Sequence, residues 1–302
     1  MEKNINLKTE SVAIIGMGAI GRLVTKGLLD AGIKCYFLDN RNPEEDTFMR
    51  YTVKNMDGSF QYLSIPSLPA TIIPDLIILC TKSYHTIQAL SGLNKRIPSQ
   101  IPLVVLQNGM GNDEQVRSCI SNPLIMATTT LGALRLQKEV ICTGKGEIYF
   151  DGKFHLEQLT SPEIPWVATK DIHSRILLKL AINAVINPLT ALLDIKNGEI
   201  LKIPEKVDPL IHEIYCIIGE RLSETDEDYL KKQILTVAEN TAENYSSMHQ
   251  DLKHSRKTEA ESILGYLVRE AARQNLPCPL ITNLLLKIKM RENNNESTNS
   301  CS

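Results

Sequence analysis

The residues best placed to do chemistry lie in one apolar segment, 177–189, whose polar members are Lys179, Asn183 and Asn187. They are four residues apart, so a helix would place them on one face. A buried lysine and buried amides need polar partners, because burial without them is costly. The stripe therefore predicts a wet cleft, in which partial burial lowers the pKa of the lysine and lets it act as an acid. The alternative is a narrow solvent-facing stripe on an amphipathic helix.

A second polar group lies further along the chain, around Ser247 and Glu259. From the residue types alone, Thr258 or Ser255 is a helix N-cap, and Glu259 is an acid in the first turn that faces the helix dipole. Under this interpretation Glu259 serves the helix and not a reaction.

A third feature is a glycine-rich turn that follows an apolar strand and opens a helix. It consists of Gly16, Met17, Gly18, Ala19, Ile20 and Gly21. The first glycine permits the tight turn, the second lets the backbone approach a pyrophosphate, and the third lets the helix pack on the strand. The helix N-terminus then offers N–H groups to the phosphates, so the turn predicts dinucleotide binding.

The end of the second strand carries the residues that choose between two dinucleotides. An acid there bonds the ribose 2′-hydroxyl of NAD, whereas an arginine accommodates the 2′-phosphate of NADP. The sequence offers both in Asp39, Asn40 and Arg41. We expect NADP, with Arg41 at the phosphate; the alternatives are NAD use through Asp39 and a merely solvated Arg41.

The elements that position these residues alternate in the first half of the chain and are helical in the second. Strands are expected at 11–16, 34–39, 75–80, 102–107 and 123–130, with shorter β stretches at 140–143 and 147–150, a hairpin at Asp57-Gly58, and helices at 19–31 and 84–95. Further helices are expected at 172–193, 205–222, 226–246, 257–274 and 279–290. The fold class is therefore α/β: an N-terminal Rossmann-like dinucleotide-binding domain with a second all-helical domain.

The predicted domain boundary falls in a proline-containing stretch. We expect a dinucleotide-binding domain over 1–166 and a helical substrate and catalytic domain over 167–302, in which the polar residues 291–302 form a disordered tail. The apolar faces of 205–222 and 279–290 either complete their own core or pair with a second copy of the chain.

Composition argues against several other classes of protein. The 302 residues carry 33 basic and 35 acidic side chains, a net charge of −2, which lacks the basic excess of nucleic-acid binding. No apolar run reaches the ~20 residues that span a bilayer, and the polar N-terminus is unlike a signal peptide. Seven scattered cysteines indicate reduced thiols in the cytoplasm, and the six histidines form no zinc-binding pattern, so no metal is expected.

The chain resembles the ketopantoate reductases, or 2-dehydropantoate 2-reductases, over nearly its whole length. The matching stretches are GMGAIG at 16–21, CTKSYHT at 80–86, QNGMGN at 107–112, ATTTLGA at 127–133, RILLKLAINAVINPLTALLDIKNGE at 175–199 and ENYSSMHQDLKHSRKTEAESILGYL at 243–267. The resemblance implies NADPH-dependent reduction of ketopantoate to pantoate, in pantothenate and coenzyme A biosynthesis, at a cleft between the two domains.

The resemblance also assigns roles to single residues. Lys179 matches the catalytic lysine that donates a proton, and Glu259 matches an acid that orients substrate and supports catalysis. Substrate-binding positions of the family match Asn183, Asn187, Ser247 and Asn108. Cofactor-binding positions match the glycine turn, Asn40, Arg41, Lys82 and Asn108. One departure concerns the cofactor, because NADPH-specific members carry a basic residue where this chain has Asn40, and Arg41 stands one position later.

Two alternatives to ketopantoate reduction remain at the level of sequence. One is a reductase of another small 2-oxo acid on the same scaffold. The other is a non-catalytic sensor of NAD or NADP, which would need the glycine turn but not Lys179, Asn183 and Glu259 together.

Overall fold

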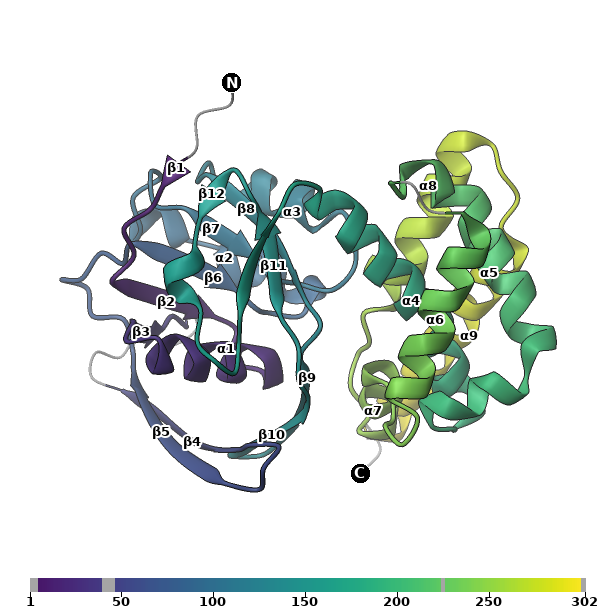
Figure 1. The fold of residues 1–302 in the computed structure, drawn as a ribbon, viewed down its shortest axis with the longest axis horizontal. Helices are drawn as coiled ribbons and strands as arrows, with labels where there is room; N and C mark the ends of the chain where they lie inside the picture. Colours follow the sequence, from purple (N-terminus) through teal and green to yellow (C-terminus); the bar gives the residue numbers. More distant parts are fainter. Residues whose placement is uncertain (1–4, 40–46, 224–225, 300–302) are drawn as a thin grey trace. The chain divides into compact units, whose positions relative to one another are not determined.

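The computed structural model describes residues 5–39, 47–223 and 226–299 (Figure 1). The chain divides into two compact units, one formed by residues 1–107 and 112–172 and the other by residues 108–111 and 173–302. The first unit contains the strands and the second is helical, so the predicted fold class is confirmed. The break at 172/173 differs from the predicted boundary at 166/167, because the strand that starts at Trp166 pairs with β11 (Ile148–Asp151).

The first unit is built on a seven-stranded sheet in the order β13-β11-β8-β7-β6-β2-β3. Besides β11, its strands are β2 (Ser11–Ile15), β3 (Lys34–Phe37), β6 (Leu76–Leu79), β7 (Leu103–Val105), β8 (Leu124–Thr129) and β13 (Trp166–Thr169). The five from β3 to β8 are parallel, and β11 runs antiparallel to β8. Every residue of β6 and β7 is buried, as expected for parallel strands covered on both faces.

A second sheet of four strands lies on the other side of α1 (Ala19–Asp30), which contacts both sheets (Figure 1). Its order is β5-β4-β10-β9, with β4 (Phe48–Lys54), β5 (Phe60–Pro66), β9 (Gly132–Leu136) and β10 (Glu139–Gly144). The hairpin predicted at Asp57-Gly58 joins β4 to β5, and Gly58 has a φ of +87° in its turn. A small third sheet pairs β1 (Ile5–Asn6) with β12 (Phe154–His155).

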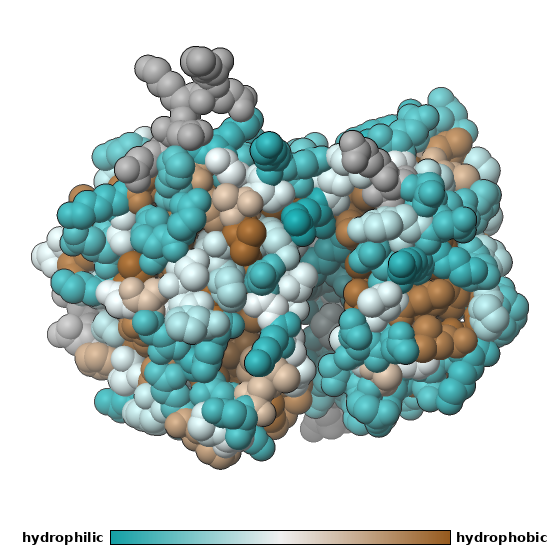
Figure 2. Space-filling model, viewed as in Figure 1, coloured by the Kyte–Doolittle hydropathy of each residue, from teal (hydrophilic) through white to brown (hydrophobic). Residues whose placement is uncertain are grey.

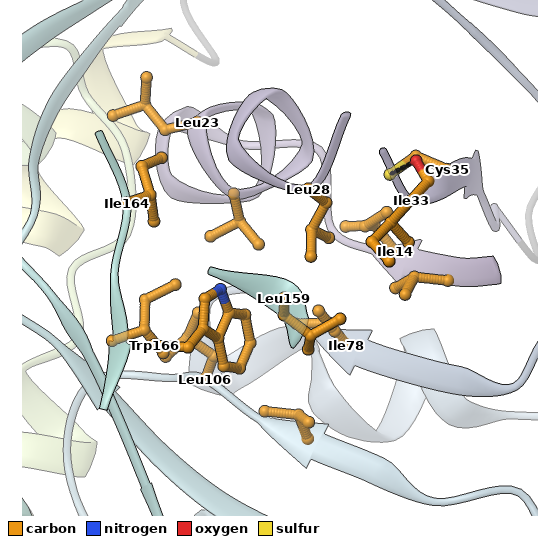
Figure 3. Close-up of a cluster of buried hydrophobic side chains, with 14 of the residues drawn as sticks. Ile14, Leu23, Leu28, Ile33, Cys35, Ile78, Leu106, Leu159, Ile164 and Trp166 are labelled. Carbon is orange, nitrogen blue, oxygen red and sulfur yellow. Dashed lines mark hydrogen bonds between the residues drawn. The ribbon is translucent and has the colours of Figure 1, made fainter. Parts of the chain in front are cut away.

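The core of the first unit packs apolar side chains of α1 against the large sheet. Figure 3 shows Leu28 of α1 on the side of Ile14 and Leu23 of α1 next to Ile164, with Trp166 beneath the helix. This packing fixes the glycine turn, because the turn joins β2 directly to α1.

The remaining helices of the first unit are short. They are α2 (Thr86–Leu90) and α3 (Asn112–Cys119), with 3₁₀ turns at Ser83–His85, Leu93–Lys95 and Glu157–Leu159. The single helix predicted at 84–95 is therefore interrupted. Gly92 adopts a left-handed φ of +77° after α2, which a continuing helix does not allow.

The second unit contains six α-helices among its described residues. They are α4 (Ile172–Leu193), α5 (Pro204–Ile218), α6 (Glu227–Asn240), α7 (Ser247–Lys253), α8 (Tyr266–Gln274) and α9 (Pro279–Asn299), with a π-helix at Glu261–Gly265 and 3₁₀ turns at Asn197–Lys202 and Gly219–Arg221. The helix predicted at 226–246 ends at Asn240, and α7, which the sequence did not predict, begins after a turn.

The tail predicted as disordered over 291–302 is wrong for its described part, because α9 continues to Asn299. The guanidinium of Arg291 donates to the carbonyl oxygens of Ala191 and Leu192, and Glu292 accepts from the backbone of Thr258. These contacts come from distant parts of the chain, so the polar composition of the segment alone did not reveal them.

The helix α4 is long and apolar enough, by length and composition, to cross a membrane, contrary to the expectation from the sequence. However, 67 % of its most apolar stretch is buried, and burial on most sides accounts for such a composition. Polar side chains cover most of the visible face of each unit, with an apolar patch over helices of the second (Figure 2). Leu286 and Met290 of α9 are exposed, so the apolar face predicted at 279–290 is not wholly used in the core.

Candidate active site

The glycine turn has the backbone that phosphate binding requires. Gly16 has a φ of +97°, and a Cβ there would lie 2.5 Å from the backbone nitrogen of Thr81. A Cβ on Gly21 would lie 2.1 Å from the carbonyl oxygen of Gly16, so only glycine lets α1 start this close to β2. By contrast, apart from its own chain neighbours, no atom of the described residues lies within 4 Å of the Cβ position of Gly18. That open space, at a helix N-terminus without a side-chain cap, fits a dinucleotide pyrophosphate.

The turn also lies at the right place in the sheet. It follows β2, which pairs with β3 on one side and with β6 on the other. The chain order therefore reverses at β2, and nucleotides bind at the carboxyl ends of strands at such a point. Lys82 follows β6 at this same edge and is half-buried.

Two residues at this edge that the sequence analysis missed are Thr81 and Gln107. The buried amide of Gln107 donates to both the carbonyl oxygen and the hydroxyl of Thr81, at 2.9 Å each. This pair ties the end of β6 to the segment after β7 and so steadies the loop that carries Lys82. In the sequence, both residues directly follow apolar strands and lie in stretches that match the family, CTKSYHT and QNGMGN.

The residues expected to contact the ribose are described only in part. Asp39 follows β3 and is half-buried. Asn40 and Arg41 lie outside the described residues, so the predicted 2′-phosphate contact stays a prediction.

In the helical unit, α4 carries the predicted stripe. The helix covers residues 172–193, as predicted, so Lys179, Asn183 and Asn187 lie one turn apart on one face. Lys179 and Asn183 are half-buried, and Asn187 is buried. This burial argues against a solvent-facing stripe.

The electrostatics of Lys179 match the expectation of a tuned acid. Burial lowers its pKa from 10.5 to about 8, and the negative charge of Glu259 acts in the opposite direction. The carboxylate therefore keeps the pKa of the lysine from falling further. Removing the charge of Glu259 would therefore lower the pKa of Lys179 further.

Glu259 is buried and bonded to a side chain far away in the sequence, with Asn108 donating from Nδ2 to Oε2 at 3.1 Å. Just before the π-helix, the hydroxyl of Thr258 accepts from the backbone N–H of Ala260, whereas Ser255 has a φ of +52° in the preceding turn. Glu259 therefore has a partner outside its own helix, which its interpretation as a dipole-facing acid did not predict.

The loop 108–111 packs against the π-helix that follows Glu259. The backbone N–H of Met110 donates to the carbonyl oxygen of Ser262 at 3.0 Å. Gly109 has a φ of +86°, and a Cβ there would lie 2.5 Å from the same oxygen. π-Helical turns are frequent at functional sites, and here the turn receives the loop that carries Asn108.

Ser247 differs from the predicted residues of α4 in its exposure. It is the first residue of α7, and its side chain is exposed. The preceding serine is the buried one: Ser246 caps α7 by accepting from His249 N and also accepts from the hydroxyl of Thr190 on α4. Thr190 also lies on α4, but the sequence pattern did not single it out. It is not four residues from a member of the stripe, and its polar group is a hydroxyl rather than an amide or an ammonium group.

The fold and the glycine turn define a Rossmann-type dinucleotide-binding protein with a helical second unit. Comparison with known proteins takes this further. Residues 12–155 match the family described as "Ketopantoate reductase PanE/ApbA", and residues 171–292 match "Ketopantoate reductase PanE/ApbA C terminal". The chain belongs to the ketopantoate reductase family, which is a family of oxidoreductases.

Individual relatives agree with this assignment. The 2-dehydropantoate 2-reductase of Escherichia coli O157:H7 is 29 % identical, over 94 % of this chain and 96 % of that one. A ternary structure of D-mandelate dehydrogenase with NADH and anilino(oxo)acetate has a TM-score of 0.82 at 20 % identity, covering 95 % of this chain and 99 % of the other. A dimeric ketopantoate reductase from Staphylococcus aureus has a TM-score of 0.80 at 20 % identity, covering 94 % and 99 %. A nicotinamide dinucleotide is thus the cofactor class that the family and the glycine turn support.

Proposed function

We propose that this protein reduces ketopantoate to pantoate with NADPH, and so serves pantothenate and coenzyme A biosynthesis. The observation that carries the proposal is the cluster of Lys179, Glu259 and Asn108 in the helical unit. It supplies a proton donor with a lowered pKa, a carboxylate that tunes it, and an amide that holds the carboxylate. Membership of the ketopantoate reductase family supports the choice of substrate.

The chemistry required of the protein is electrostatic and acid catalysis. When bound, the nicotinamide dinucleotide supplies the hydride. Reduction leaves negative charge on the former carbonyl oxygen of a 2-oxo acid. Protonated Lys179 stabilises that charge and donates its proton to the oxygen. A pKa of about 8 suits this task, since the lysine is largely protonated at neutral pH yet gives up its proton more readily than an exposed lysine.

The amides of the α4 stripe are suited to holding the substrate. Asn183 and Asn187 lie one and two turns beyond the lysine on the same face and provide neutral donors for a carboxylate and a hydroxyl. We assign Ser247 to the same task, from the exposed first turn of α7.

The cofactor preference within the proposal is NADPH. Arg41, at the predicted 2′-phosphate position, carries this preference, and Lys82 contributes a positive charge at the same sheet edge. Asp39 favours the alternative, NADH, because a carboxylate after β3 is suited to a ribose hydroxyl.

A second candidate function is the reduction of another small 2-oxo acid. The structural likeness to D-mandelate dehydrogenase, which was solved with NADH and anilino(oxo)acetate, supports it. A 2-oxo acid with an aromatic group in place of the branched hydroxyalkyl chain would meet the same lysine and carboxylate.

The test is the loss of absorbance at 340 nm with purified protein, run with NADPH and NADH against ketopantoate and phenylglyoxylate. We expect rapid oxidation of NADPH with ketopantoate. Preference for NADH would keep the reaction and assign the ribose contact to Asp39, and preference for phenylglyoxylate would establish the second candidate. The proposal fails if the folded protein binds nucleotide but oxidises it with neither acid.

A further inference from the structure

Two adjacent side chains of α9 attach to the two segments that carry the proposed catalytic pair. Arg291 donates to the carbonyl oxygens of Ala191 and Leu192, at 3.1 and 2.8 Å, in the last turn of α4. Glu292 accepts the backbone N–H of Thr258 at 2.6 Å. One turn of α9 therefore reaches both the helix of Lys179 and the residue next to Glu259.

The hydrogen bond from Thr258 to Glu292 holds the backbone of the residue that precedes Glu259. Thr258 is buried, so its N–H would lose its partner without gaining full solvation if Glu292 were removed. The backbone there would shift to recover a hydrogen bond, and Glu259 is the next residue. A shift of that backbone changes the distance of the carboxylate from both Asn108 and Lys179.

Two other charged groups near Thr258 in the chain form ion pairs. Glu261, at the start of the π-helix, pairs with Arg269 and Lys289. Arg256, in the loop before Thr258, pairs with Asp251 of α7. By contrast, the carboxylate of Glu292 accepts a hydrogen bond from the backbone N–H of Thr258.

We infer that Glu292 is a positioning residue that holds Glu259 at its working distance from Lys179, and that Arg291 anchors this part of α9 to α4. The inference rests on the proposed function, because it gives Glu292 a purpose only if Glu259 acts together with Lys179. It assigns a mechanistic role to a segment whose composition is that of a polar tail.

The experiment compares Glu292→Ala with Glu292→Gln, which keeps an acceptor oxygen at the same reach. Glu239→Ala, an exposed glutamate on α6, is the matched control. We measure kcat, KM and the pH dependence of kcat/KM with ketopantoate, and dinucleotide affinity by fluorescence. We expect Glu292→Ala to lower kcat about tenfold and to move the alkaline limb to lower pH, with unchanged dinucleotide affinity. Glu292→Gln and Glu239→Ala should behave like the wild type.

A variant that keeps the charge guards against a folding defect in Glu292→Ala. Glu292→Asp withdraws the acceptor by one methylene, and we expect the same direction of change in both kcat and the alkaline limb. The inference is overturned if the alkaline limb of kcat/KM lies at the wild-type pH in Glu292→Ala and Glu292→Asp but at a lower pH in Glu259→Gln. It is equally overturned if Glu292→Gln is as impaired as Glu292→Ala. If Glu259→Gln itself leaves kcat and the limb unchanged, Glu259 leaves the mechanism, and the proposed function fails at that residue together with the inference.

Discussion

The glycine turn and the lysine cluster differ in how the chain builds them. The glycine turn is made by six consecutive residues, and its geometry depends on backbone: Gly16 and Gly21 approach main-chain atoms too closely for any side chain. The cluster is made by side chains from α4, the loop 108–111 and the turn before the π-helix, and Asn108 and Glu259 are 151 positions apart in the chain. The first site is local in sequence, and the second exists only when the helical unit is folded.

This contrast predicts different consequences of substitution. A change in the glycine turn should alter dinucleotide affinity or the fold, since the backbone itself does the binding. A change in the cluster should alter turnover and its pH dependence, because charge and proton transfer reside there. The following predictions test whether the two regions separate in this way.

The largest effect is expected for Lys179→Ala. Losing the proton donor should reduce kcat by roughly 10²–10⁴-fold, the usual contribution of a positioned general acid. Dinucleotide affinity should not change, because the glycine turn lies in the other unit. Steady-state kinetics at 340 nm test the predicted loss of kcat, and a nucleotide titration of the same preparation tests the unchanged affinity. Near-normal turnover would remove the lysine from the mechanism.

The next effect is expected for Gly21→Ala. Its Cβ would overlap the carbonyl oxygen of Gly16 at 2.1 Å, which forces α1 away from β2. We expect a stability loss of about 1–3 kcal/mol, as for overpacking, together with weakened dinucleotide binding. Thermal unfolding with and without NADPH measures both. A variant with the stability and affinity of the wild type would show that this close approach does not constrain the turn.

A sharper test of the same turn is Gly18→Ala. Among the described residues, no atom other than those of its chain neighbours lies within 4 Å of the added Cβ, so the unfolding temperature should match that of the wild type. Dinucleotide affinity should nevertheless fall about tenfold, because the methyl group occupies space needed by the pyrophosphate. Unchanged affinity would mean that the phosphates bind elsewhere.

The smallest effect is a gain in stability from Lys179→Met. The pKa of Lys179 is about 8 in the folded chain against an ordinary 10.5, so folding carries the cost of a buried charge. Allowing for partial exposure, the variant should be about 1–2 kcal/mol more stable at pH 7. The unfolded chain holds the extra proton between pH 8 and 10.5, so the advantage should shrink across that window. Denaturant unfolding at pH 7 and 10 tests it, and equal stability at pH 7 would argue that the charge is well solvated.

The sequence alone predicted features that are local in the chain better than features that depend on distant contacts. The glycine turn, the bounds of α4 and the β4–β5 hairpin were predicted because each depends on residues close together in the chain. The alternating strands and later helices likewise gave the fold class. The four-stranded sheet and its contact with α1 were not predicted, since β4 pairs with β10 across a long stretch of chain.

The errors in the site also come from distant contacts. Glu259 resembled a capping acid until its bond to Asn108 was known. The segment after residue 290 resembled a tail because Arg291 and Glu292 find their partners about 100 and 34 residues away. Ser246 and Ser247 are adjacent serines, and only the structure shows that the first is the helix cap.

The most direct test of the account is the pH dependence of kcat/KM for the 2-oxo acid, measured for the wild type and for Glu259→Gln at saturating dinucleotide. Activity requires protonated Lys179, so the wild-type rate should fall as the pH rises through about 8. Glu259 raises the pKa of that lysine, so its neutral replacement should move the fall to lower pH. Coincident alkaline limbs in the two proteins would contradict the central claim that Glu259 and Lys179 act as a coupled pair.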